Sequence, residues 1–172
     1  IRFEDQVAAA IEQGVGKFGG LDIVVNNASA LGLTGLQETT MKMYDRMQDI
    51  NARGSYVTTQ LAMPHLLKAD NPHVLNIAPP LNLDPKWFAG HSAYTFSKYG
   101  MSAWVLGMAG EFRDRGVAFN ALWPVTAIAT AAPPFRHRRS TRRGRHWPSS
   151  WSSAWWSASI CCSSCSWMNS TV

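Results

Sequence analysis

A tyrosine and a lysine four residues apart, Tyr94 and Lys98, are the pair in this sequence best suited to acid–base chemistry. They open an apolar run, Ala93 to Ala109, that predicts a helix, and residues four apart in a helix lie on the same face. A free phenol has a pKa of about 10, and a nearby ammonium group lowers it by favouring the phenolate. The pair could therefore exchange a proton with an alcohol or carbonyl oxygen. Both are also ordinary helix residues, so the spacing alone leaves a purely structural role open.

The net charge of the 172-residue chain is distributed unevenly. Residues 1–132 contain 10 Lys and Arg and 11 Asp and Glu, whereas residues 133–172 contain six Arg and no acidic residue. The overall charge of +5 therefore belongs to the C-terminal tail, and the body predicts no nucleic-acid partner. The sequence shows no secretory signal and no apolar run long enough to cross a bilayer, and the body has no Cys. We expect a cytoplasmic protein without a membrane partner, or a peroxisomal or mitochondrial one in a eukaryote.

Strand and helix patterns alternate along the body of the chain. Three short apolar segments predict strands, at residues 21–25, 73–78 and 117–123. Nearly continuous apolar character, clearest in the first segment, is typical of strands buried on both faces of a parallel sheet. Helical patterns precede and separate these strands, at residues 4–18, 40–68 and 91–115. We predict an α/β fold with a doubly wound parallel sheet and right-handed crossovers.

Asparagines occupy two further places where chemistry could occur. Asn26-Asn27-Ala28-Ser29 follows the first predicted strand, and α/β sheets bind ligands at the carboxyl ends of their strands. A plain turn is the alternative, because Asn is common in turns. Asn51 interrupts the helix predicted at 40–68, since Asn is a mediocre helix former. A solvated polar residue is the alternative there.

Taken together, the motifs resemble the classical short-chain dehydrogenase/reductase family over residues 1–132. The matching motifs are Asn26-Asn27-Ala28-Ser29 for N-N-A-G, Asn51 for the family's helix asparagine, Tyr94 and Lys98 for Y-x-x-x-K, and Asn120 to Pro124 for N-x-x-x-P-G. Four motifs in the right order and spacing make the resemblance specific. Within the family, the segments at 76–83, 93–102 and 120–124 resemble the hydroxysteroid dehydrogenase-like branch.

The resemblance implies an oxidoreductase that uses NAD or NADP to transfer hydride between a primary or secondary alcohol and a carbonyl compound. Tyr94 would be the acid–base group, and Lys98 would hold the nicotinamide ribose and lower the pKa of Tyr94. Asn51 would anchor a water molecule that links Lys98 to solvent for proton relay. These three residues are the expected catalytic set, and no metal is implied.

The resemblance also implies an incomplete Rossmann-like sheet, a set of cofactor contacts and an association between subunits. The expected cofactor contacts are Asn27, Ala28 and Lys98 near the ribose, and Pro124, Thr126 and Ile128 near the carboxamide. The helices predicted at 40–68 and 91–115 are similar to those that join subunits in the family. A complete protein would therefore be a homo-oligomer that acts on a small alcohol or carbonyl compound.

The sequence departs from the family's pattern where the catalytic serine is expected. Ala78 and Pro79 occupy those positions, and neither side chain can donate a hydrogen bond. Loss of one oriented donor at a developing oxyanion typically costs ~10²–10³ in rate. Ser92 is the nearest substitute, but two residues before Tyr94 it would lie on another face of the helix. Val125 in place of the glycine of P-G is a minor change.

The family's glycine-rich phosphate loop has no counterpart before residue 21. Gly14-Val15-Gly16 lies inside a helix pattern and does not follow a strand. We therefore expect a fragment that begins after the third strand of the fold, is inactive alone, and leaves the strand at 21–25 as an apolar edge. The residues that distinguish NAD from NADP would lie in the missing part. The alternative is a non-catalytic protein whose helices only bind partners.

The segment at 133–172 is rich in Arg, Ser, Trp and Cys and has no helix or strand period. This composition predicts a disordered tail, unrelated to the domain at 1–132, and a reading-frame shift after Ala132 would explain the abrupt change. Its three Cys and two His lack a standard zinc spacing. The run of Arg with aromatic residues leaves binding to nucleic acid or a membrane as the alternative to an unstructured artefact.

Overall fold

The computed structural model describes residues 1–123 of the chain. The predicted cofactor contacts Pro124, Thr126 and Ile128 lie outside the described residues, as does the predicted tail at 133–172. The predicted α/β fold with a parallel sheet is confirmed within the described part.

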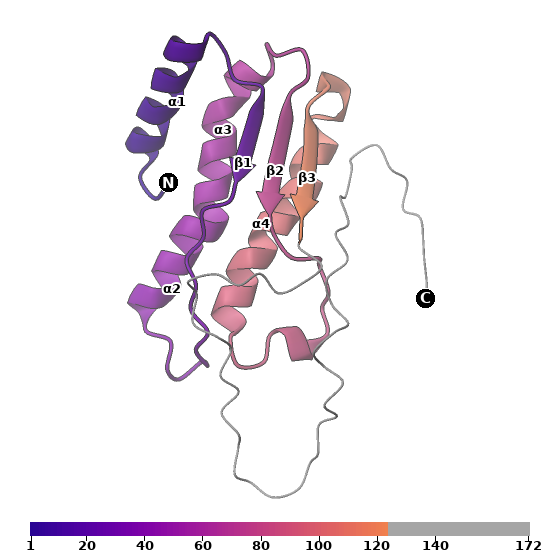
Figure 1. The fold of residues 1–172 in the computed structure, drawn as a ribbon. Coiled ribbons are helices and arrows are strands. Elements are labelled where there is room, and N and C mark those ends of the chain that lie inside the picture. Colours follow the sequence, from indigo (N-terminus) through magenta and orange to yellow (C-terminus); the bar gives the residue numbers. More distant parts are fainter. Residues whose placement is uncertain (124–172) are drawn as a thin grey trace, which may run out of the picture.

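The sheet contains three parallel strands in the order β1-β2-β3. The strands are β1 (Ile23–Asn26), β2 (His73–Ile77) and β3 (Ala118–Leu122) (Figure 1). Val25 pairs with Leu75, and Leu75 pairs with Asn120, so all three strands end at the same edge of the sheet. The predicted strands are confirmed, with ends that differ by one or two residues because hydrogen-bonded pairing, and not the apolar run, defines a strand.

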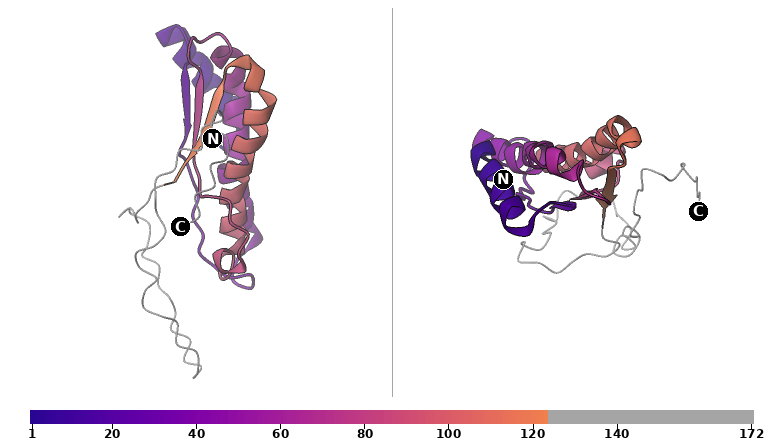
Figure 2. Two further views of the ribbon diagram at one scale, coloured as in Figure 1. Left: turned by 90° about the vertical axis from the view of Figure 1, so that its right-hand side faces the viewer. Right: turned by 90° about the horizontal axis from the view of Figure 1, so that it is seen from above.

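The helices all lie on one side of this sheet. They are α1 (Glu4–Phe18), α2 (Met41–Met47), α3 (Gly54–Leu66) and α4 (Ser92–Glu111), with the short segments η1 (Gln48–Arg53), η2 (Pro85–Trp87) and η3 (Arg113–Arg115). α3 and α4 cover one face of the sheet, and α1 packs beside α3 (Figure 2). Right-handed crossovers between strands added in one direction require this one-sided arrangement. Within residues 1–123, no helix is both long enough and apolar enough to cross a membrane.

The interruption predicted at Asn51 takes the form of a π-helix. α2 begins after Thr40, whose hydroxyl oxygen accepts a hydrogen bond from the Met43 amide at 3.2 Å. The segment η1 follows directly with π-helical geometry, and α3 continues from its last residue. A π-helical turn inside a helix is frequent at functional sites. Here it accompanies a complete burial of the Asn51 side chain.

The hydrophobic core lies between the sheet and the two helices α3 and α4. Alternate strand residues point into it, and Val74 and Phe119 are each 1% exposed. Leu66 of α3 and Val105 of α4 fill the space from the other side. Burial of such side chains stabilises the fold by roughly 1.5–3 kcal/mol each.

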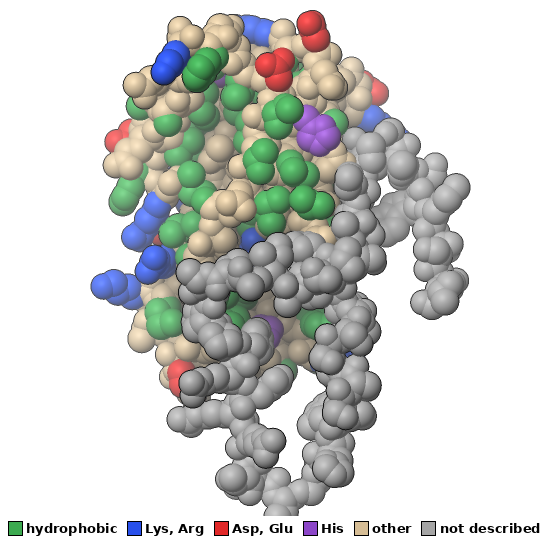
Figure 3. All heavy atoms as spheres, viewed as in Figure 1, with side chains coloured by type: hydrophobic (Ala, Val, Ile, Leu, Met, Phe, Trp, Pro, Cys, Tyr) green, Lys and Arg blue, Asp and Glu red, His purple; other side chains and the backbone are tan. Residues whose placement is uncertain are grey.

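The opposite face of the sheet is not covered by any helix of residues 1–123 (Figure 2). Ile23 and Val25 of β1 point to this face and are 59% and 53% exposed. Figure 3 shows hydrophobic side chains gathered over the strands on this side. The prediction that β1 is buried on both faces is therefore wrong for the described part of the chain, because the helices there cover one face alone. A contiguous apolar surface of this kind usually packs against further protein.

The packing predicts that core and surface phenylalanines differ in their contribution to stability. Phe119→Ala should lower the free energy of unfolding by about 3–5 kcal/mol, because it removes a ring from the centre of the core. Phe96→Ala is the matched control, since Phe96 is 63% exposed on α4. Urea denaturation of the two variants measures the difference, and equal losses would contradict the packing described here.

Candidate active site

A cavity of about 450 Å³ opens at the carboxyl ends of β1 and β2. It is lined by residues that follow these two strands and by the first turns of α4, among them Asn27, Ser29, Ile77, Tyr94 and Lys98. Cavities of this size at strand ends of α/β sheets commonly bind small molecules. The structure thus brings the predicted acid–base pair to the place where a ligand would lie.

A second cavity, of about 500 Å³, lies along α1 near Thr58 of α3. Apolar residues such as Val7, Ile11 and Phe18 line it, and no titratable side chain does. It therefore offers no acid–base side chain, and the hydroxyl group of Thr58 donates to the Gly54 carbonyl oxygen at 2.8 Å. Within residues 1–123, no three His, Cys, Asp or Glu side chains gather as metal ligands either.

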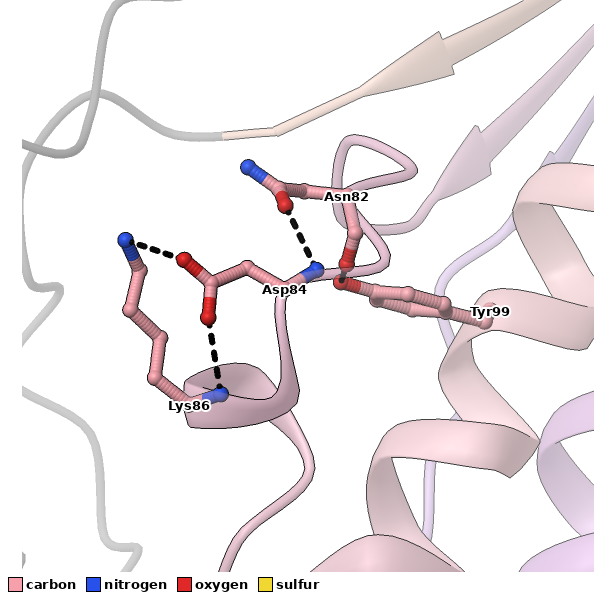
Figure 4. A network of polar contacts seen from close by, with 4 residues as sticks. All are labelled: Asn82, Asp84, Lys86 and Tyr99. Atoms are coloured by element: carbon pink, nitrogen blue, oxygen red, sulfur yellow. Dashed lines mark hydrogen bonds and ion pairs between the residues drawn. The ribbon is translucent and has the colours of Figure 1, made fainter.

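The loop before α4 is held in place by its own polar contacts (Figure 4). Asn82 Oδ1 accepts a hydrogen bond from the Asp84 amide at 2.9 Å, and Asp84 Oδ1 accepts one from the Lys86 amide at 3.0 Å. Lys86 Nζ also pairs with Asp84 Oδ2 at 2.8 Å, and these contacts with Lys86 hold the pKa of Asp84 below its usual value. Tyr99 of α4 donates its hydroxyl proton to the Asn82 carbonyl oxygen at 2.7 Å. The loop is thereby fixed against the helix that carries Tyr94.

Tyr94 lines the cavity, and burial raises the pKa of its hydroxyl group above the usual value for tyrosine. A hydrogen bond with the Ser29 side chain acts in the opposite direction and is the smaller effect. The predicted lowering of this pKa by Lys98 is therefore wrong for the structure described here. Desolvation outweighs the hydrogen bond, and the ammonium group of Lys98 makes its contacts elsewhere.

Lys98 points its ammonium group toward the end of β2. Nζ donates a hydrogen bond to the Ile77 carbonyl oxygen at 2.7 Å and contacts Met101 Sδ at 3.3 Å. Burial disfavours the charged form and lowers the pKa of Lys98 from 10.5 to about 8. Lys98 is thus mostly protonated at neutral pH but close to its titration range.

The side chain of Asn51 is fully buried, so a solvated role is excluded. Its Oδ1 accepts a hydrogen bond from the Ala30 amide at 2.7 Å, and its Nδ2 donates to the Ala30 carbonyl oxygen at 2.9 Å. The same Nδ2 donates to Ser97 Oγ at 2.8 Å, and Ser97 in turn donates to the Tyr94 carbonyl oxygen at 2.7 Å. Asn51 therefore connects the segment after β1 with the first turn of α4.

A small-residue contact allows this connection to be short. A Cβ atom added at Gly100 of α4 would lie 3.0 Å from the Cβ of Ala52 in η1. This separation is tighter than ordinary van der Waals contact, so glycine lets α4 approach the π-helical turn closely. The approach brings Ser97 within hydrogen-bonding distance of Asn51.

The four residues Asn26 to Ser29 divide into structural and cavity positions. Asn26 is buried, and its Nδ2 donates to Thr59 Oγ1 at 3.0 Å and to Asn76 Oδ1 at 2.8 Å. Asn27 and Ser29 line the cavity. Ala28 is exposed and lies outside the cavity lining, although a cofactor contact was predicted for it.

The position of the family's serine is occupied by a buried methyl group. Ala78 is 3% exposed, and its amide donates to the Leu122 carbonyl oxygen at 3.1 Å. Ser92, the substitute considered from sequence, is exposed and lies outside the cavity lining, as its helix face predicts. Sequence reasoning missed Ser29, and the signal that could have found it is its place at the end of a motif that directly follows a strand.

Comparisons with known proteins identify the family of this chain. The family description "short chain dehydrogenase" matches residues 1–138. The hydroxysteroid dehydrogenase-like protein 2 of Danio rerio is 61% identical over 132 residues, which are 77% of this chain and 32% of that protein. The chain therefore spans about a third of the length of the curated relatives it matches.

Solved structures of short chain dehydrogenases are also similar to this chain. A short chain dehydrogenase from Mycobacterium thermoresistibile is 48% identical with a TM-score of 0.72, over 76% of this chain and 46% of that one. A short chain dehydrogenase from Burkholderia cenocepacia, solved in complex with NADP, is 28% identical with a TM-score of 0.64, over 73% of this chain and 50% of that one. The fold, the tyrosine–lysine pair and the family match together show that this chain belongs to the short-chain dehydrogenase family.

Proposed function

We propose that the cavity is the place where hydride passes between a nicotinamide cofactor and an alcohol or carbonyl substrate. The observation that carries this proposal is the convergence of Tyr94, Lys98 and Asn27 on one cavity at the carboxyl ends of β1 and β2. Tyr94 acts as the acid–base group. Lys98 and Asn27 supply the polar contacts that hold the cofactor's ribose.

The described residues fit the nicotinamide–ribose half of such a cofactor. A buried ammonium group and an amide at the strand ends offer hydrogen-bond donors for ribose hydroxyl groups. When bound, the cofactor supplies or accepts the hydride. Both NAD and NADP suit these contacts, and Pro124, Thr126 and Ile128 are the proposed neighbours of its carboxamide.

The protonation state of Tyr94 determines how it acts. Because burial raises its pKa, the hydroxyl group is protonated at neutral pH and can give its proton to a carbonyl oxygen. In the reverse direction, the phenolate accepts the proton of a bound alcohol. A bound cofactor would bring Lys98 to the ribose and change the electrostatic surroundings of Tyr94.

Asn51 serves as a positioning residue, and we assign the proton relay to the same π-helical turn. Its side chain is engaged with Ala30 and Ser97, so a relay would use other groups of this turn.

The outer surfaces of α3 and α4 are the proposed contact between subunits. There the rings of Tyr56 and Trp104 are in contact in a tilted arrangement, with centroids 4.9 Å apart, and both residues are 38% exposed.

Tyr94→Phe should lower kcat by about 10²–10⁴-fold, because it removes the proton that the substrate oxygen receives. The assay follows NADH and NADPH absorbance with a panel of alcohols and carbonyl compounds, using the full-length protein that contains this chain. Tyr44→Phe is the matched control and should retain the wild-type rate, since Tyr44 of α2 lies outside the cavity lining. Wild-type turnover by Tyr94→Phe would contradict the proposal.

The lowered pKa of Lys98 makes stability depend on pH. Between pH 8 and 10.5 the unfolded chain keeps the Lys98 proton that the folded chain releases, so stability rises with pH in this window. Relative to Lys98→Met, the wild-type free energy of unfolding should increase by at most about 3 kcal/mol from pH 7 to pH 10. Urea denaturation at several pH values measures this increase. Lys42→Met, at an exposed lysine, should keep the wild-type dependence of the free energy of unfolding on pH. The same wild-type dependence in Lys98→Met would contradict the burial of the Lys98 charge.

A further inference from the structure

The site described above offers the substrate oxygen one proton donor, Tyr94, because Ala78 has no hydroxyl group. The described cavity-lining residues with hydroxyl groups are Ser29, Tyr94, Thr95 and Tyr99. Thr95 donates its proton to the Trp87 carbonyl oxygen at 2.9 Å. Tyr99 donates to the loop before α4, as described above. Both protons are thus engaged in holding the cavity wall.

Ser29 is the remaining hydroxyl group of the described cavity lining beside Tyr94, and its side chain is exposed. Its influence on Tyr94 acts against the rise in pKa that burial causes. We propose that Ser29 replaces the family's missing serine and donates a second hydrogen bond to the substrate oxygen beside Tyr94. This inference rests on the proposed function of the cavity.

The backbone holds Ser29 in place for this role. Ala30, the next residue, is 6% exposed and is held by two hydrogen bonds to the side chain of Asn51. Asn51 also reaches the Tyr94 carbonyl oxygen through Ser97. One buried side chain therefore links the main chain beside Ser29 to the main chain of Tyr94, and this limits how far the two residues can move apart.

The chemistry needs no group beyond those already named. In carbonyl reduction, the carbonyl carbon accepts the hydride that the reduced cofactor supplies, and the π electrons of the C=O bond move to the oxygen. Tyr94 gives its proton to this oxygen, and the carbonyl compound becomes an alcohol while the cofactor is oxidised. Ser29 keeps its proton and donates a hydrogen bond as negative charge develops on the oxygen.

The first test compares two serines close to Tyr94. Ser29→Ala in the full-length protein should lower kcat by about 10²–10³-fold, with a smaller change in KM, because the lost donor acts mainly in the transition state. Ser92→Ala is the matched control and should keep the wild-type kcat, since Ser92 lies outside the cavity. Adding Ala78→Ser to Ser29→Ala should restore part of the rate by returning a hydroxyl group to the position of the family's serine.

The second test measures Tyr94 directly and does not need turnover. Tyrosinate absorbance, taken as the difference between each protein and its Tyr94→Phe counterpart, gives the titration of Tyr94. Ser29→Ala should raise its pKa, because the serine hydrogen bond favours the phenolate. Circular dichroism of the variant checks that it is folded.

The outcomes separate this inference from the proposed function. Loss of turnover in Tyr94→Phe together with a wild-type kcat in Ser29→Ala would overturn the role of Ser29 alone. Wild-type turnover in Tyr94→Phe would overturn the proposed function. An unchanged Tyr94 titration in folded Ser29→Ala would show that the two hydroxyl groups do not interact, and the inference would then be wrong.

Discussion

The need to satisfy one buried amide, that of Asn51, determines how the candidate site is built. A buried amide left without partners costs about 1–3 kcal/mol, so each of its polar atoms must meet a donor or acceptor. Ala30 after β1 and Ser97 on α4 provide them. Because these partners lie on two different elements, the amide also sets the separation of the segment with Ser29 from the helix with Tyr94.

A second buried polar group acts in parallel at the end of the sheet. Asn26 joins β1 to Thr59 of α3 and to Asn76 of β2, and Asn76 continues to the Met101 carbonyl oxygen of α4 at 2.9 Å. The hydrophobic core holds the sheet to the helices, but apolar contacts are not directional. Directional polar contacts fix the site at the edge of the sheet, and they explain why small polar residues are buried there.

The sequence alone predicts those features that depend on neighbours along the chain. Apolar runs gave the three strands, and the spacing of Tyr94 and Lys98 placed them on one face of a helix. The burial of Asn51 could not be predicted, because its partners come from distant segments. The pKa direction of Tyr94 was wrong for the same reason, since desolvation depends on the assembled cavity and not on the spacing of two residues. The exposed face of β1 likewise depends on which elements cover the sheet.

The way in which the loop at 81–90 is attached has a consequence for the evolution of substrate range. Two side chains of α4 hold it, Tyr99 at Asn82 and Thr95 at Trp87, and both bonds end on main-chain oxygen atoms. A main-chain oxygen is present whatever the side chain, so the residues of this wall can change type without loosening the anchors. Natural variation or directed evolution can therefore change the side chains of the pocket wall while the acid–base group keeps its position. The attachment of the loop thus lets substrate specificity change independently of the chemical step.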